Sequence, residues 1–205
     1  MMAEKLLLFG GTFDPVHKGH TNILQAAYQQ GGFDRAIVLP NAISPLKTGS
    51  PEASNAQRFE MLELAFSGLE WCSISDMEFN MPQPSYTVNT LEKLKSESPS
   101  AQLFWLCGAD VIKEFHMWYR ADKIIELASL AVVKRDSARR PDFAEIEAKL
   151  GKKLPHIIID SPLYDISSTE IRRRLSSGNV ISGLVPEAVE QYIKENNVYS
   201  ANSAG

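Results

Sequence analysis

The chain has 205 residues, of which 44% are hydrophobic and 22% charged, ordinary proportions for a globular protein with its own core. Its formal net charge of −4 argues against a nucleic-acid-binding protein, because such proteins usually carry a basic face. No apolar run approaches the length of a transmembrane helix, and Cys72 and Cys107 lack the spacing of a metal site. We therefore expect a cytoplasmic protein with reduced cysteines and with no nucleic-acid or membrane partner.

Short apolar runs alternate with segments of helical periodicity along the chain. Strands are predicted at residues 5–9, 35–40, 72–79, 103–108, 130–134 and 157–160. Helices are predicted at about 18–30, 56–66, 87–96, 121–128, 142–150, 168–177 and 186–195. Several strands are apolar without interruption, which is typical of parallel strands covered on both faces. We predict the α/β class: a doubly wound, Rossmann-like parallel sheet with a short C-terminal helical segment at about 161–200.

The first predicted strand leads into residues 10–20, whose sequence is GGTFDPVHKGH. We expect the strand to break at Gly10 and Gly11 and the chain to restart as a helix near Lys18. Such a junction points unpaired backbone N–H groups beyond the end of the strand. Because helix starts of this kind bind anions, the motif predicts a phosphate site.

Two histidines stand three residues apart within this motif. His17 and His20 should lie on nearly the same face at the start of the helix, with Gly19 keeping the surface between them open. Such a face suits the phosphates of a nucleotide. A metal site is the other interpretation of the pair, but no third ligand follows at metal-site spacing, so we expect none.

A second helix start occurs near the other end of the chain, in residues 166–172, ISSTEIR. Ser167 and Glu170 have the spacing of a capping box, which begins a helix. The N–H groups there and the Ser168 hydroxyl would be donors, and Arg172 lies one turn into the helix. Taken alone, this segment indicates a helix cap rather than a binding site.

Together the two motifs resemble the nucleotidyltransferase superfamily that pairs His-x-Gly-His with an Ile-Ser-Ser/Thr-x-x-Ile-Arg segment. The first motif is most similar to that of the nicotinate-nucleotide adenylyltransferases, and the resemblance spans residues 8–172. It implies an enzyme of NAD biosynthesis with ATP and nicotinate mononucleotide as substrates, and with Mg²⁺ carried by the ATP phosphates. One nucleotidyltransferase domain is expected over 1–200, followed by a frayed tail at 201–205. Whether it forms a homo-oligomer is left open.

The resemblance also implies roles for individual residues. The implied catalytic residues are His17, His20, Lys47 and Arg172. The implied ATP-binding residues are Gly10, Gly11, Thr12, Phe13, Gly19, Gly108, Asp110, Arg135, Ser167 and Ser168. The implied nicotinate-nucleotide-binding residues are Thr87, Trp118 and Tyr119, and the indole of Trp118 suits a flat pyridine ring. From the residues alone, Trp118 is equally well interpreted as a core aromatic.

The loop after the second predicted strand departs from the family. Residues 44–47 have the sequence SPLK where the family usually has Pro-Pro-His-Lys. Lys47 remains available to neutralise phosphate charge, but Leu46 replaces a histidine that could donate a hydrogen bond. This change affects the fine tuning of the site and the prediction of which pyridine nucleotide is accepted, and it leaves the predicted class of reaction unaltered. The surrounding segment 41–55 is predicted to be a loop that could act as a lid.

Other functions stay open at this point. One is a sister enzyme acting on nicotinamide mononucleotide or phosphopantetheine, and another is a non-catalytic nucleotide sensor, which the loss of the loop histidine would fit. The class I tRNA synthetases share the histidine motif, but this short, acidic chain is poorly suited to hold tRNA.

Overall fold

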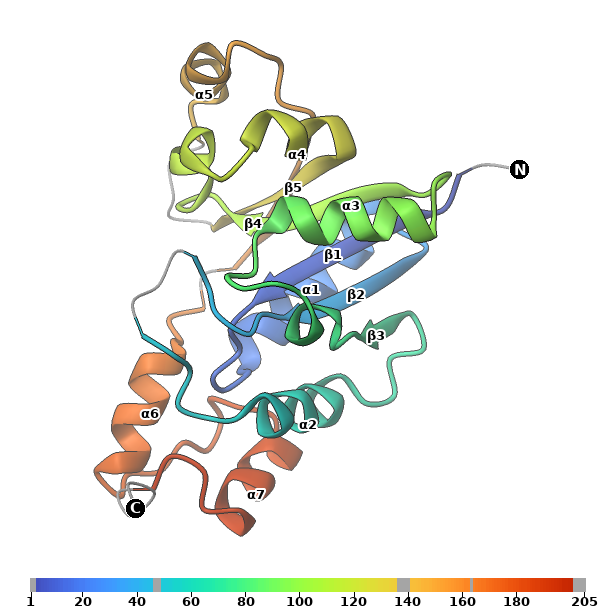
Figure 1. The fold of residues 1–205 in the computed structure, drawn as a ribbon. Helices are drawn as coiled ribbons and strands as arrows, with labels where there is room; N and C mark the ends of the chain where they lie inside the picture. The colour runs from blue at the N-terminus through green and yellow to red at the C-terminus, as the bar shows by residue number, and fades with distance from the viewer. Residues whose placement is uncertain (1–2, 46–48, 136–140, 163, 201–205) are drawn as a thin grey trace.

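The computed structural model describes residues 3–45, 49–135, 141–162 and 164–200 (Figure 1). Its parallel strands form one sheet in the order β3-β2-β1-β4-β5-β6. The strands are β1 (Lys5–Gly11), β2 (Arg35–Pro40), β3 (Cys72–Ile74), β4 (Gln102–Gly108), β5 (Ala128–Arg135) and β6 (His156–Ser161). The predicted parallel sheet is confirmed.

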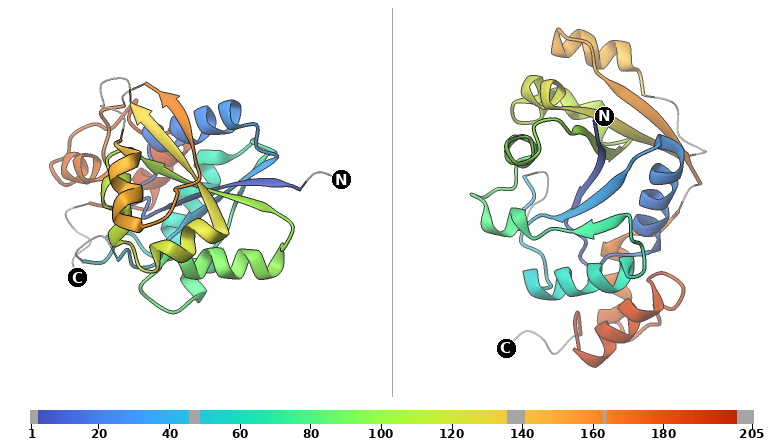
Figure 2. Two further views of the ribbon diagram at one scale, coloured as in Figure 1. Left: turned by 90° about the horizontal axis from the view of Figure 1, so that it is seen from above. Right: turned by 90° about the vertical axis from the view of Figure 1, so that its right-hand side faces the viewer.

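Helices cover both faces of this sheet (Figure 2). They are α1 (Lys18–Gly31), α2 (Asn55–Phe66), α3 (Thr87–Glu97), α4 (Ala121–Leu127), α5 (Phe143–Leu150), α6 (Ser168–Ser176) and α7 (Glu187–Glu195), with 3-10 helices η1 (Met77–Asn80) and η2 (Ile112–Met117). Leu7 of β1 belongs to a core shared with α1, α2, α6 and α7, whereas Leu6 and Leu8 belong to one shared with α3, α4 and α5. Successive residues of β1 thus enter two different cores, which explains its uninterrupted apolar run.

The predicted strand at 72–79 is wrong in its second half. Only Cys72–Ile74 pairs with β2, and η1 follows after a short turn. Asp76 makes the turn, and its backbone carbonyl accepts the N–H of Phe79 at 2.9 Å. This local hydrogen bond replaces the pairing that a longer strand would need.

The predicted break of the first strand at the two glycines is also wrong. β1 continues through Gly10 and Gly11, which stand opposite Leu39 and Pro40 of β2. A Cβ built on Gly10 would lie 2.4 Å from Cζ2 of Trp105. Glycine is therefore required by the close approach of the indole ring rather than by a turn.

We expect Gly10→Ala to lower the free energy of unfolding by about 1–3 kcal/mol, as overpacking of a filled site does. Trp105 is only 6% exposed, so its ring cannot move aside without disturbing the core. Urea denaturation measures the loss. Adding Trp105→Phe, which shortens the clashing ring, should recover part of it, and a complete lack of recovery would contradict the clash.

The order of the strands positions a site at one edge of the sheet. The chain runs outward in opposite directions from β1 and β4, and in such sheets ligands bind outside the carboxyl ends of the strands at this reversal. After β6, α6 and α7 pack on the core that contains Leu7, and α7 (red in Figure 1) lies against α2.

Within the described ranges, no helix has both the length and the apolar character that crossing a membrane requires.

Candidate active site

A cleft opens at the carboxyl ends of β1 and β4. Its larger hollow, of about 700 Å³, is lined by residues that include Gly10, Gly11, Thr12, Phe13, His20, Thr87, Gly108, Asp110, Trp118, Tyr119 and Ser168. A second hollow of about 630 Å³ shares Thr12, His20 and Ser168 with the first and adds His17, Gly19, Ser167 and Arg172. Two motifs from opposite ends of the chain therefore face a common space.

The two histidines of the first motif stack on each other at the start of α1. Their ring centroids are 3.6 Å apart, which confirms that they share a face. The backbone N–H of His17 donates to Nδ1 of His20 at 3.2 Å. Because Nδ1 accepts this bond, neutral His20 carries its proton on Nε2, which makes Nε2 a hydrogen-bond donor.

His17 is buried, with 6% of its surface exposed. A Cβ on Gly19 would lie 3.0 Å from the His17 ring, so the glycine lets this ring lie close to the helix. Burial lowers the pKa of His17 to about 4. The imidazole is therefore neutral at pH 7.

This lowered pKa gives a pH dependence to stability. The unfolded chain protonates His17 below about pH 6.5, whereas the folded chain does so only near pH 4. The contribution of neutral His17 to the free energy of unfolding is therefore fully present above pH 6.5 and declines as the pH falls toward 4. Between pH 7 and 4.5, urea unfolding of the native chain should lose about 2 kcal/mol more than that of His17→Gln. An equal loss in both proteins would contradict a buried, neutral His17.

The start of α6 forms as predicted, but its cap is only half of a capping box. Ser167 is the N-cap, and its Oγ accepts the N–H of Glu170 at 3.2 Å. The Glu170 carboxylate accepts hydrogen bonds from Arg173 and Arg174 and does not return one to the cap. Two arginine guanidinium groups are stronger partners for a carboxylate than one backbone N–H.

The second motif is hydrogen-bonded directly to the first. Ser168 Oγ donates to the carbonyl oxygen of Pro15 at 2.9 Å. Arg172 donates through Nη1 to the carbonyl oxygen of Asp14 at 2.7 Å and through Nε to Glu52 at 2.6 Å. These contacts hold the two helix starts side by side. A phosphate that binds Arg172 must compete with Glu52 for the guanidinium.

The end of β4 contributes a carboxylate to the cleft. The side chain of Asp110 lies close to Gly108: a Cβ on Gly108 would be 2.8 Å from Asp110 Oδ1, so glycine leaves room for the carboxylate.

The neighbouring Cys107 is buried and free, and burial raises its pKa to about 12. Its thiol is therefore inert, as expected for a reduced core cysteine.

Tyr86, Trp118 and Tyr119 line one part of the larger hollow, which we call its aromatic end. The rings of Tyr86 and Tyr119 lie 4.5 Å apart, and Trp118 lies 5.2 Å from Phe115. Trp118 packs on the core and also lines the cleft, so a place in the core does not prevent it from contacting a ligand. Thr87 begins α3 beside these rings. A flat ring can stack here, and the N–H groups at the start of α3 suit an anion attached to it.

Comparison with known proteins identifies the family. The sequence model described as Cytidylyltransferase-like matches residues 8–174. A Synechococcus sp. (strain JA-3-3Ab) protein named probable nicotinate-nucleotide adenylyltransferase is 36% identical over 198 residues, covering 96% of this chain and 95% of that protein. This chain belongs to the nicotinate-nucleotide adenylyltransferase family.

A further member agrees with this assignment, and a solved structure shares the fold. A Neisseria meningitidis protein with the same name is 37% identical over 201 residues, covering 96% of this chain and 98% of its own length. A Plasmodium falciparum nicotinic acid mononucleotide adenylyltransferase, solved in complex with NaAD, has a TM-score of 0.78 at 19% identity. It covers 96% of this chain and 97% of its own, and it shows that the two proteins share a fold.

Two of the residues assigned from the resemblance to this family are not placed in its cleft. Lys47 lies outside the described residues, as does Leu46, which departs from the family pattern. Arg135 is the last residue of β5, but its side chain is also outside the description. All the other assigned residues line the cleft.

Arg58 was not among the site residues predicted for this member of the adenylyltransferase family, yet it forms a hydrogen bond with the backbone of the first motif. It is fully buried, and its Nη1 donates to the carbonyl oxygens of Thr12 and Asn41, each at 2.7 Å. In a trans peptide the carbonyl and the next N–H point in opposite directions, so this contact turns the N–H of Phe13 away from Arg58. The available signal was its position on the apolar face of α2, three and four residues before Met61 and Leu62.

Asp14 stands within the predicted motif but was given no role. Its carboxylate accepts hydrogen bonds from the N–H groups of Glu52 at 2.8 Å and Ala53 at 3.1 Å, and from the Tyr199 hydroxyl at 2.7 Å. Burial and the nearby Asp14 charge raise the pKa of Tyr199 above its usual range. Asp14 thus joins the motif to the loop before α2 and to the end of the chain. No spacing rule in the sequence links residues so far apart.

The described residues contain no group of three or more His, Cys, Asp or Glu side chains arranged to hold a metal ion.

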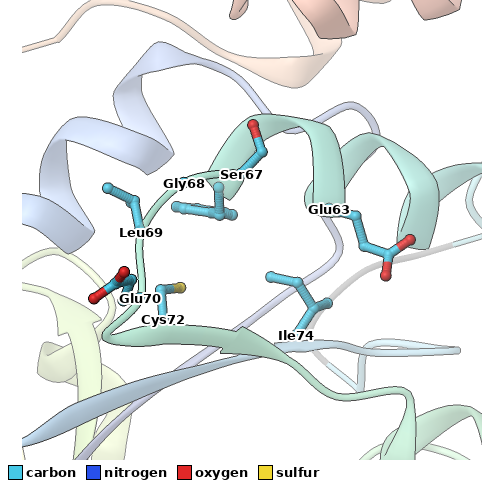
Figure 3. Close-up of a pocket in the computed structure, with 8 residues that line it drawn as sticks. Glu63, Ser67, Gly68, Leu69, Glu70, Cys72 and Ile74 are labelled. Carbon is cyan, nitrogen blue, oxygen red and sulfur yellow. The ribbon is translucent and has the colours of Figure 1, made fainter.

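A further hollow, of about 380 Å³, lies under the turn from α2 to β3 (Figure 3). Its lining includes Glu63 and Glu70 and none of the residues assigned to the site. Two carboxylates make this hollow a poor place for a phosphate.

Proposed function

We propose that this chain transfers the AMP moiety of ATP to nicotinate mononucleotide, producing deamido-NAD and pyrophosphate. The observation that carries the proposal is that the two motifs predicted to bind phosphate line one cleft, which aromatic side chains also line. Family membership supports the reaction. The NaAD complex and a second complex with APC of the Plasmodium falciparum enzyme, which shares the fold, support this pair of substrates.

We infer a position in the cleft for each part of the substrates. The triphosphate of ATP would lie between the starts of α1 and α6, and Asp110 at the end of β4 would bind a ribose hydroxyl of the adenosine. The nicotinate ring would stack at the aromatic end, near Trp118 and Tyr119. Its carboxylate would then face the N–H groups at Thr87, where the dipole of α3 favours negative charge.

Adenylyl transfer needs no covalent enzyme intermediate. A phosphate oxygen of nicotinate mononucleotide attacks the α-phosphorus of ATP, a new P–O bond forms, and the bond to the bridging oxygen breaks to release pyrophosphate. The protein supplies positioning and charge stabilisation. We infer that the N–H of Phe13 orients the attacking phosphate and that His20 Nε2 donates to the phosphate oxygens as negative charge accumulates.

The remaining side chains act on the charge of the triphosphate. Arg172 and Lys47 would offset the charge of the departing pyrophosphate, and neutral His17 would donate a hydrogen bond to a phosphate oxygen. Mg²⁺ would enter with ATP, held by the phosphates and by water, which are the hard oxygen ligands it prefers.

Product analysis tests the proposal. The purified protein is incubated with Mg²⁺, ATP labelled at the α-phosphorus and one acceptor at a time, and the products are separated by chromatography. Label in a dinucleotide with nicotinate mononucleotide is the expected result. Label only with nicotinamide mononucleotide or phosphopantetheine would reassign the chain to a sister enzyme. Nucleotide binding without any product would indicate a sensor.

A further inference from the structure

One acidic side chain lines the aromatic end of the cleft and has no part in the mechanism above. Glu78, in η1, is 3% exposed and lines the same hollow as Tyr86, Thr87 and Trp118. Its Oε1 accepts a hydrogen bond from the Thr90 hydroxyl at 2.7 Å. Thr90 lies one turn into α3, so this bond ties the carboxyl of Glu78 to the helix whose first residue, Thr87, lines the hollow.

A second set of contacts joins the backbone of Glu78 to the edge of the cleft through Gln83. Ser85 Oγ donates a hydrogen bond to Gln83 Oε1 at 3.1 Å and accepts the N–H of Ala42 from the loop after β2. Gln83 Nε2 donates to the backbone carbonyl of Glu78 at 2.9 Å. Glu78 is thus held in place at the wall of the hollow.

The other ionisable groups around Glu78 come from several elements. Arg58 of α2 lies 5.2 Å from the ring of the adjacent Phe79 and donates its hydrogen bonds to backbone and amide oxygens. Asp76 begins η1, and Tyr86 precedes α3. The ionisable groups that line the hollow from its other walls are His20, Asp110, Cys107 and Tyr119.

We propose that Glu78 is a specificity-determining residue that reads charge at the pyridine end of the cleft: as the neutral acid it admits a ring that carries a carboxylate, and as the carboxylate it repels that ring. This inference rests on the proposed function, which places the nicotinate ring at the aromatic end. A pyridine nucleotide with an uncharged amide in the same position escapes the repulsion.

The chemistry of the position supports a change of charge near neutral pH. Burial raises the pKa of Glu78 to about 7, against the opposing effect of the hydrogen bond from Thr90. Because Glu78 is buried, water screens its charge poorly, and a second carboxylate close to it would be repelled strongly. Affinity for the acid substrate should therefore fall as the pH rises through about 7.

The test compares the native protein with Glu78→Gln, which keeps the size and hydrogen bonding of the side chain but cannot ionise. The value of kcat/KM for nicotinate mononucleotide is measured from pH 6 to 8.5 and normalised to each protein's own value at pH 6. The substrate phosphate titrates identically in both assays and cancels. We expect the native value to fall about tenfold further than that of Glu78→Gln, through the KM for this substrate and not for ATP. Parallel pH profiles would overturn the proposal.

A second variant keeps the test decisive should Glu78→Gln fail to fold. Thr90→Val removes a hydrogen bond that lowers the pKa of Glu78, so the fall in kcat/KM should move to higher pH than in the native protein. An unmoved midpoint would contradict the role of Glu78. Absence of product with nicotinate mononucleotide at every pH would instead refute the proposed function, so the two failures are distinguishable.

Discussion

Replacing His20 with alanine is expected to lower kcat by about a hundredfold or more, the usual cost of removing a preorganised donor to developing negative charge. His20 lines both hollows of the cleft, and the hydrogen bond from the His17 N–H to Nδ1 leaves the proton on Nε2. Alanine removes this donor without adding bulk. Steady-state rates with saturating ATP and nicotinate mononucleotide measure the loss.

A matched control separates this effect from the general loss of a histidine. His156 begins β6 and stacks on Phe143, and it does not line the cleft. His156→Ala should therefore keep kcat within about twofold of the native value. Unfolding curves would show that His20→Ala is folded at the assay temperature. A kcat near normal in folded His20→Ala would exclude a catalytic role for this side chain.

Replacing Arg58 with methionine is expected to lower the free energy of unfolding by about 3 kcal/mol. Methionine fills much of the volume but leaves the buried carbonyl oxygens of Thr12 and Asn41, and the amide of Asn55, without their donors. The peptide between Thr12 and Phe13 would also lose its fixed orientation, so we expect kcat/KM to fall in protein that remains folded. Urea denaturation and steady-state kinetics measure the two effects.

Arg35 provides the matched surface control. It pairs with Glu4 across an exposed contact, and exposed ion pairs contribute about 0–1 kcal/mol. Arg35→Met should therefore change stability little. Arg58→Lys keeps the charge but cannot bond two carbonyls through one planar group, so it should recover only part of the loss. Equal stability of Arg58→Met and Arg35→Met would show that the buried contacts contribute nothing.

Local sequence was sufficient for most of the fold. Apolar runs and helical periodicity depend on neighbours a few residues away. Apart from β3, they located the strands and α-helices of the described part of the chain to within two residues at each end. The prediction failed at the ends of two strands, where hydrogen bonding rather than the apolar pattern decided the outcome. Gly10 stays in β1 because β2 pairs with it, and the third predicted strand ends early because Asp76 turns the chain.

The residues of the candidate site also fall into two groups: those that local sequence reveals and those that only the fold brings together. The two motifs and the family that they resemble could be found from the sequence, because a strand end, a pair of histidines and a helix cap are each encoded by adjacent residues. Their meeting in one cleft, with Ser168 bonded to Pro15, required the sheet that carries them. Burial of Arg58 and Glu78 and the contact of Tyr199 with Asp14 depend on chain segments that only folding brings together. Sequence alone thus determined the chemical groups, and the tertiary structure decided which of them lose water and gain partners, since burial and long-range contact are properties of the packed chain.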